Sequence, residues 1–180
     1  VVLGDSGAMG GDNSEEFMAL ATTGEGVIVY TEGDDYAATD EKAKVNYQFP
    51  MPQEPGDLEL VETPNCATIA DVSNFFGVDE SVCAKALDLI VQEKPVFVFI
   101  PGDRDLNMTK LAAYLGVGEH EIEMMDDETI LAMGSFPGFT GPMNLNEDAR
   151  IIIDESLTRL DNLIIGANRE NHHYKNANYG

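Results

Sequence analysis

The sequence is poor in basic residues, and this shortage narrows the range of functions. Ten lysines and arginines stand against thirty-three acidic residues, so the formal net charge is −23. A field of this sign repels phosphate backbones and argues against autonomous binding of nucleic acid. The simplest interpretation of the charge is a solvated acidic surface. A role on nucleic acid would then depend on local geometry, or on basic surface elsewhere in a longer protein.

Cysteines are also few, and long apolar runs are missing. Cys66 and Cys83 match no metal or redox spacing, so we expect free thiols and a reducing, cytoplasmic setting. Cys83 has apolar neighbours, which favours a small core residue over a nucleophile. No run is long enough to span a bilayer, and the start has no basic or apolar signal-peptide region. These two absences predict a protein that does not act at a membrane. Because the chain does not begin with Met, we also expect it to be a piece of a longer protein.

Composition divides the chain into three parts. Residues 1–47 form one unit, residues 48–57 are a proline-rich stretch that is typical of a linker, and residues 58–180 form the main domain. In the main domain, hairpins alternate with helices without strict βαβ order. This order predicts an α+β fold, with a mixed β-sheet and helices packed over it.

Several segments allow a more detailed prediction. The glycine-rich start "GDSGAMGG", residues 4–11, lacks the Lys-Ser/Thr of a phosphate loop, so an ordinary turn is favoured. The stretch 85–103 predicts two strands around a turn at 92–95, and Val96–Ile100, apolar on both faces, predicts a central covered strand. Residues 172–178, "HHYKNAN", predict an edge strand.

Three kinds of side chain are candidates for chemistry. Lys85 opens an apolar strand far from any basic cluster, so it is either a snorkelling lysine or an isolated cation ready for an anion. Asp154 ends the strand "RIIID", where it either begins a turn or faces a site at the strand ends. His172 and His173 are adjacent in a predicted strand, so one would line a pocket while the other meets water.

The segment "GSFPGFTGP", residues 134–142, is the most distinctive loop of the chain. Its three glycines permit backbone angles that other residues resist, and its two prolines fix their own φ. We therefore expect a stiff, tightly shaped loop that is neither helix nor strand. Such a loop suits a site where backbone N–H groups must approach a ligand closely.

The motifs together resemble a known family. Residues 1–47 look like the stretch of bacterial-type prolyl-tRNA synthetase that precedes its inserted editing domain, and the remainder is similar to that domain and to freestanding YbaK-like deacylases. The motifs that carry the resemblance, in the expected order, are "GDSGAMGG", "SEEFMALATTGEGVIVYTEGDDYAA", "VETPNCATIADVSNFFGV", "KALDLIV", "PGDRDLNMTKL", "PGFTGPMN", "IIID" and "IIGANRENHHY".

The resemblance implies a function and partners. It implies hydrolysis of the ester bond of mischarged alanyl-tRNA(Pro), with no cofactor for editing. The partners would be the aminoacylated 3′ end of tRNA(Pro) and the rest of the synthetase chain. The parent enzyme would ligate proline to tRNA(Pro) with ATP and Mg²⁺, as a cytoplasmic homodimer. The excess of acidic residues would then fit a domain that leaves most of the tRNA binding to its parent.

The resemblance also implies roles for single residues. Lys85 matches the functional lysine near the tRNA's 3′-terminal nucleotide. Gly138 and Pro142 match the GxxxP loop, His173 matches the pocket histidine, and Asp154 matches a strand-end aspartate of the site. No role is implied for His172.

Two alternatives remain beside editing. The insertion could be catalytically silent and serve a structural or tRNA-positioning role, although the joint presence of Lys85, Gly138, Pro142 and His173 argues against this. A freestanding deacylase is the other alternative, which the synthetase-like residues 1–47 argue against. The family usually has Ser-His-Glu-Phe where this chain has Ser14-Glu15-Glu16-Phe17. That departure puts in doubt the function of this segment in the catalytic core of the synthetase. It does not affect the prediction of editing.

Overall fold

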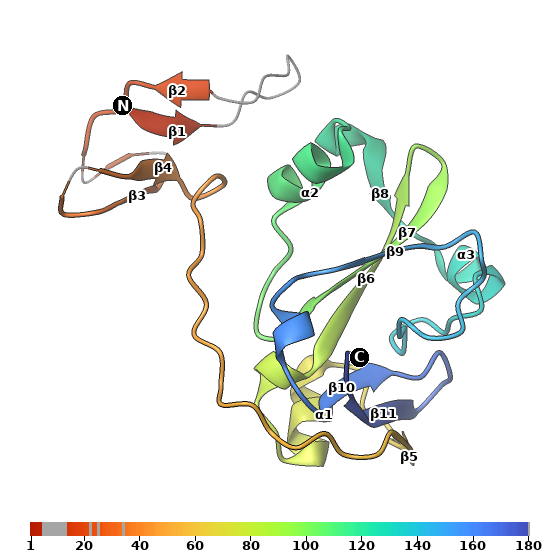
Figure 1. The fold of residues 1–180 in the computed structure, drawn as a ribbon. Coiled ribbons are helices and arrows are strands. Elements are labelled where there is room, and N and C mark those ends of the chain that lie inside the picture. Colours follow the sequence, from red (N-terminus) through yellow and green to blue (C-terminus); the bar gives the residue numbers. More distant parts are fainter. Residues whose placement is uncertain (5–13, 22, 25, 34, 180) are drawn as a thin grey trace. The chain divides into compact units, whose positions relative to one another are not determined.

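The contacts of the chain form two compact units in the computed structural model (Figure 1). The structure describes residues 1–4, 14–21, 23–24, 26–33 and 35–179. One unit combines Val1–Asn46 with Asn107–His120, and the other combines Tyr47–Leu106 with Glu121–Gly180. The predicted turn at residues 4–11 lies almost wholly outside the described residues.

The first unit contains a small sheet with the strand order β2-β1-β4-β3. β1 is antiparallel to β2 and parallel to β4, and β3 is antiparallel to β4. Helix α2 groups with this sheet although it is distant in sequence: Asn107 Nδ2 donates to the Glu41 carbonyl at 3.1 Å, and Lys110 Nζ donates to the Ala43 carbonyl. The elements of this unit are β1 Val2–Gly4, β2 Ser14–Glu16, β3 Ile28–Tyr30, β4 Ala37–Thr39 and α2 Met108–Leu115.

The second unit contains two further sheets, with the orders β8-β6-β7-β9 and β10-β11-β5. Sheets of mixed direction with a few short helices make an α+β fold, as the sequence predicts. The edge position predicted for residues 172–178 is wrong, because β5, about 110 residues earlier, pairs with the second side of β11. The strands are β5 Glu59–Glu62, β6 Ala84–Val91, β7 Lys94–Pro101, β8 Ile122–Met124, β9 Arg150–Ile153, β10 Leu163–Gly166 and β11 His172–Ala177.

β6 and β7 form a long hairpin that supports the rest of the second unit (Figure 1). The turn occurs where the sequence predicts it, with Gln92 and Glu93 at φ values of +48° and +64°. Positive φ at both central residues is what a two-residue hairpin loop needs to match the twist of its strands. The predicted central strand is confirmed, because β7 lies between β6 and β9 and Val96–Ile100 are at most 5% exposed.

One hydrophobic core cluster of the second unit includes side chains from one face of this hairpin. Phe97 and Phe99 pack against Leu157 and Leu163, and all four side chains are at most 1% exposed. Burying an aromatic or leucine side chain contributes roughly 1.5–3 kcal/mol, so this cluster is a major source of stability. The hairpin is therefore a firm support for side chains that β6 presents.

The helices are short and well capped. The second unit contains the helices α1 Ile69–Phe76 and α3 Asp127–Ala132 and the 3₁₀ turns η2 Glu80–Val82 and η4 Leu157–Arg159. A further 3₁₀ turn, η3, comprises Glu119–Glu121. Thr68 and Asp71 form a reciprocal capping box at the start of α1, and Gly77 ends it in a left-handed conformation at φ +66°. Among the described residues, none of the helices has the length and apolar character that a membrane crossing requires.

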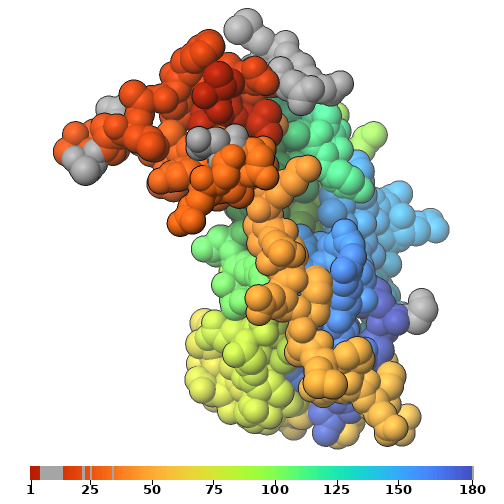
Figure 2. All heavy atoms as spheres, turned by 60° about the vertical axis from the view of Figure 1, so that its left-hand side comes forward, coloured from red at the N-terminus to blue at the C-terminus, as the bar shows by residue number. Residues whose placement is uncertain are grey.

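Residues 48–57, predicted as a linker, have no regular structure but are bound along the second unit. The Gln53 amide donates to Asp161 Oδ2, and the Gly56 amide donates to Asn162 Oδ1, both at 2.8 Å. The Arg159 guanidinium lies 5.1 Å from the centre of the Phe49 ring, a cation–π contact. Figure 2 shows this orange segment lying against the blue segment that contains Arg159 and Asp161.

Candidate functional site

A pocket of about 140 Å³ opens in the second unit. Its wall is formed by the start of α1, residues of β6, the loop 138–140, Gly166 at the end of β10, and His173 of β11. Pockets for drug-sized ligands measure roughly 300–1,000 Å³, so this one suits a smaller group. Three of the five predicted site residues, Lys85, Gly138 and His173, belong to the wall.

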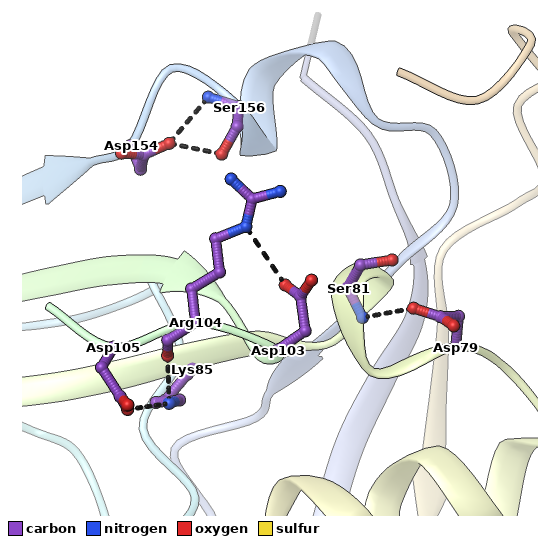
Figure 3. A network of polar contacts seen from close by, with 8 residues as sticks. All are labelled: Asp79, Ser81, Lys85, Asp103, Arg104, Asp105, Asp154 and Ser156. Carbon is purple, nitrogen blue, oxygen red and sulfur yellow. Dashed lines mark hydrogen bonds and ion pairs between the residues drawn. The ribbon is translucent and has the colours of Figure 1, made fainter. Parts of the chain in front are cut away.

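Lys85 reaches the wall from the start of β6, and its side chain is 28% exposed. The ammonium donates to the Arg104 carbonyl and to Asp105 Oδ1, the latter at 3.1 Å (Figure 3). The Asp105 side chain is fully exposed, and an ion pair in such a position contributes at most about 1 kcal/mol. An incoming anion can therefore replace Asp105 at little cost.

The loop 134–142 is shaped by close contact with the end of β10. A Cβ atom built on Gly141 would lie 1.8 Å from the carbonyl oxygen of Gly166, and one on Gly166 would lie 2.3 Å from that of Thr140. Gly138 adopts φ +80°, a conformation that favours glycine. Pro142 follows Gly141 directly and is half-buried, but it is not part of the pocket wall.

Two residues of this loop that belong to the pocket wall have backbone amides without a protein acceptor. The Phe139 amide donates to the Phe136 carbonyl at 2.9 Å, and the Gly141 amide donates to Asn168 Oδ1 at 2.7 Å. In the part of the chain that the structure describes, the amides of Gly138 and Thr140 donate to no protein acceptor. Both residues belong to the pocket wall. These two amides are therefore candidates to donate to a small group in the pocket.

His173 is a neutral wall residue. It is 6% exposed, its Nδ1 shares a 2.7 Å hydrogen bond with Thr63 Oγ1, and its ring centre lies 5.5 Å from that of Phe139. Burial lowers the pKa of His173 to about 4, and nearby His172 lowers it further in the same direction. His172 is half-exposed and contacts the Glu170 carbonyl instead. The opposite orientation of the two histidines is as the strand pattern predicts.

The depressed pKa of His173 predicts a loss of stability in mild acid. Below pH 6.5 the unfolded chain takes up a proton that folded His173 refuses until about pH 4. The free energy of unfolding should therefore fall as pH decreases through this window, by up to about 1.4 kcal/mol per pH unit. Denaturant unfolding of wild type and His173→Gln at several pH values measures it. An equal slope in the two proteins would contradict the prediction.

Asp154 lies outside the pocket wall, in the turn before η4. Its Oδ1 accepts hydrogen bonds from the Ser156 amide at 2.9 Å and from the Ser156 hydroxyl (Figure 3). This is the turn-forming arrangement that the sequence leaves open as one alternative. A role of Asp154 in the reaction stays a prediction.

Sequence reasoning missed two polar residues at the site. Asp88 belongs to the pocket wall, is 9% exposed, and its Oδ2 accepts from Thr140 Oγ1 at 2.8 Å. Asn168, at φ +55°, holds the loop through the Gly141 amide and the Met143 carbonyl. The signal for Asp88 was a lone acid inside the apolar run "ALDLIV". Asn168 gave no such signal, because its importance depends on the fold.

Neither cysteine has the character of a nucleophile. Cys66 and Cys83 are free and buried. Burial, with Glu80 and Asp79 nearby, raises the pKa of Cys83 to about 11, so its thiol stays protonated at neutral pH. In the described part of the chain, no group of three or more His, Cys, Asp or Glu side chains could hold a metal ion.

Comparisons with known proteins agree with this geometry. The family model of the aminoacyl-tRNA editing domain matches residues 63–179. The chain is 58% identical over its whole length to a proline–tRNA ligase of Finegoldia magna, and 38% identical over 98% of its length to that of Bacillus subtilis. It spans only 31% of each of these relatives.

Solved structures support the fold. A crystal structure of a proposed trans-editing enzyme for prolyl tRNA synthetase is 17% identical, with a TM-score of 0.59 over 67% of this chain and 76% of that one. A crystal structure of the hypothetical protein APE2540 is 22% identical, with a TM-score of 0.58 over 66% of this chain and 79% of that one. The predicted resemblance is thereby confirmed at the level of the family: the chain belongs to the aminoacyl-tRNA editing domain family.

Proposed function

We propose that this chain hydrolyses the ester bond of alanyl-tRNA(Pro) and so removes alanine that was attached in error. The observation that carries the proposal is the small pocket whose wall contains two unpaired loop amides, those of Gly138 and Thr140. Family membership and the similarity to proline–tRNA ligases support the same substrate. The aminoacyl group would enter the pocket, and the 3′-terminal nucleotide would remain at its mouth.

The reaction needs no protein nucleophile. Water adds to the ester carbonyl carbon, the carbonyl oxygen gains negative charge, and the bond to the ribose oxygen then breaks to release alanine and tRNA. The loop amides of Gly138 and Thr140 donate hydrogen bonds to the developing oxyanion. Donors fixed in advance are effective because they need no reorganisation during the reaction. A hydroxyl group of the substrate ribose assists proton transfer, as the family resemblance implies.

Lys85 and His173 complete the arrangement. Lys85 exchanges Asp105 for the terminal phosphate or ribose of the tRNA and acts as a point charge. Neutral His173, held by Thr63, lines the pocket and hydrogen-bonds the amino acid or the attacking water. Pro142 would act from outside the wall by shaping the loop, and Asp154 would act by shaping the turn before η4.

The shape of the pocket beside the loop would supply the selectivity. Alanine is smaller than proline, so a synthetic site built for proline cannot exclude it by size. The tightly packed loop would limit the space beside the reacting carbonyl, so that the methyl group of alanine fits there and the proline ring does not. This is the second sieve of a double-sieve mechanism.

The longer protein would be a proline–tRNA ligase. It would join proline to tRNA(Pro) with ATP and Mg²⁺ in the cytoplasm, as a homodimer, whereas editing itself would use no cofactor. Its other domains would bind most of the tRNA, since this chain carries a net charge of −23. We therefore expect this chain, when it is isolated, to bind tRNA weakly.

The proposal is tested by following deacylation of alanyl-tRNA(Pro) and prolyl-tRNA(Pro). We expect hydrolysis of the alanyl ester and at least about tenfold slower hydrolysis of the prolyl ester. Lys85→Ala should slow alanyl hydrolysis at least about tenfold through weaker binding of the tRNA end. The matched control is Lys94→Ala, an exposed lysine at the far end of the same hairpin. If neither this chain nor the full-length ligase hydrolyses alanyl-tRNA(Pro), the structural alternative replaces the proposal.

A further inference from the structure

Asp88 is an acidic group of the pocket that the proposed reaction does not use. It belongs to the pocket wall and is only 9% exposed. One carboxylate oxygen, Oδ2, accepts from Thr140 Oγ1 at 2.8 Å, but Oδ1 is buried without a hydrogen-bond partner. Leaving an oxygen of a buried carboxylate unpaired is costly, so a partner for it is expected in the working protein.

The described residues place no cation beside Asp88. Lys85, which also belongs to the wall, pairs with Asp105 instead. His173, which lines the same pocket, is neutral because burial lowers its pKa to about 4. Burial also raises the pKa of Asp88, as expected for a carboxylate without a positive partner. The pocket is therefore prepared for a small positive group from outside.

We infer that Asp88 binds the α-ammonium group of the aminoacyl ester and thereby selects substrates with a free amino group. The inference rests on the proposed function, because it assigns a part of the same substrate. An ammonium group offers three donors, and it would satisfy both the charge and the unpaired oxygen of Asp88. Esters whose nitrogen is acylated, such as peptidyl-tRNA, carry no such charge and would bind poorly.

The chemistry of the substrate fits this placement. The ammonium nitrogen and the ester carbonyl carbon are both bonded to the same Cα, so their binding groups must be close together. Thr140 meets this requirement, since its hydroxyl donates to Asp88 while its amide is one of the free loop donors. Ser135 Oγ lies 2.8 Å from Thr140 Oγ1 and 2.9 Å from Asn168 Oδ1, which connects Asp88 to the loop support. Binding of the ammonium would thus hold the carbonyl at the loop.

The test compares two esters on two proteins. Alanyl-tRNA and lactyl-tRNA differ only in an ammonium in place of a hydroxyl, and each enzymatic rate is divided by the spontaneous rate of the same ester. We expect wild type to favour the alanyl ester at least about tenfold. Asp88→Asn, which keeps an acceptor oxygen for Thr140, should lose about tenfold on the alanyl ester and less than about twofold on the lactyl ester.

The outcomes separate the inference from the function on which it rests. If wild type accelerates both esters equally, the inference is overturned while ester hydrolysis stands, and this comparison needs no variant to fold. An equal loss on both esters in a folded Asp88→Asn protein also overturns it, since a merely structural role would have that effect. If wild type hydrolyses neither ester, the proposed function fails and the inference fails with it.

Discussion

Replacing Gly141 by alanine is expected to displace the loop 138–142 and to slow alanyl ester hydrolysis at least about 100-fold. The added Cβ atom would lie 1.8 Å from the carbonyl oxygen of Gly166, which is backbone and cannot move without disturbing β10. The loop must then move away, and its free amides leave the position where the oxyanion forms. Deacylation of alanyl-tRNA(Pro) and thermal unfolding of the variant measure the two effects.

The control for this substitution is Gly26→Ala. The nearest atom to a Cβ at Gly26 is Met18 Cε at 3.9 Å, an ordinary contact, and the substitution should leave hydrolysis within about twofold of wild type. The reciprocal change, Gly166→Ala, should resemble Gly141→Ala, because its Cβ would lie 2.3 Å from the Thr140 carbonyl oxygen. Near-normal hydrolysis by Gly141→Ala would show that the loop does not supply the catalytic donors.

Replacing Asn168 by glycine is expected to lower the free energy of unfolding by about 3 kcal/mol and to reduce kcat more than affinity. The Asn168 side chain accepts from the Gly141 amide at 2.7 Å and donates to the Met143 carbonyl. Without it, the buried amide of Gly141 loses its acceptor. Glycine accommodates the φ of +55° without strain, so the effect combines the lost hydrogen bonds with the greater freedom of glycine in the unfolded chain, which the control Asn144→Gly shares.

The matched control is Asn144→Gly, in the segment that follows the loop. Asn144 has a similar φ of +60°, but no side-chain bond holds it to the loop in the described structure. Its replacement should change the free energy of unfolding by less than about 0.5 kcal/mol. Urea unfolding and single-turnover deacylation of both variants provide the comparison. A loss at Asn168 no larger than that at Asn144 would remove Asn168 from its supporting role.

Much of the second unit was predictable because local patterns and tertiary packing agree there. The apolar run Val96–Ile100 identified the central strand, and the turn between β6 and β7 followed from a break in the pattern. α1 ends at Gly77 in a left-handed conformation that favours glycine, so a local preference also determines this end. The position of β11 was not predictable. Its pairing with β5 joins segments about 110 residues apart, and no local pattern records such a partner.

The candidate site was likewise predictable from the sequence only in part. The motifs and the resemblance pointed to Lys85, Gly138 and His173, and the structure places all three in one pocket wall. Asp154 could not be assigned between a turn and a site from its position at a strand end. Asp88 and Asn168 were missed, because their significance depends on the neighbours that folding provides.

By itself, the sequence determined the α+β class, the net negative charge, the glycine- and proline-rich character of the loop 134–142 and the resemblance to the editing family. These are properties of composition, local backbone preference and motif order, and they need no knowledge of distant contacts. Only the tertiary structure decided what the loop is shaped around. Packing of Gly141 on Gly166 and the support from Asn168 fix the loop, while Asp88 becomes unusual only when its burial without a positive partner is known. Those facts concern residues brought together from distant positions, which is why the sequence alone could not supply them.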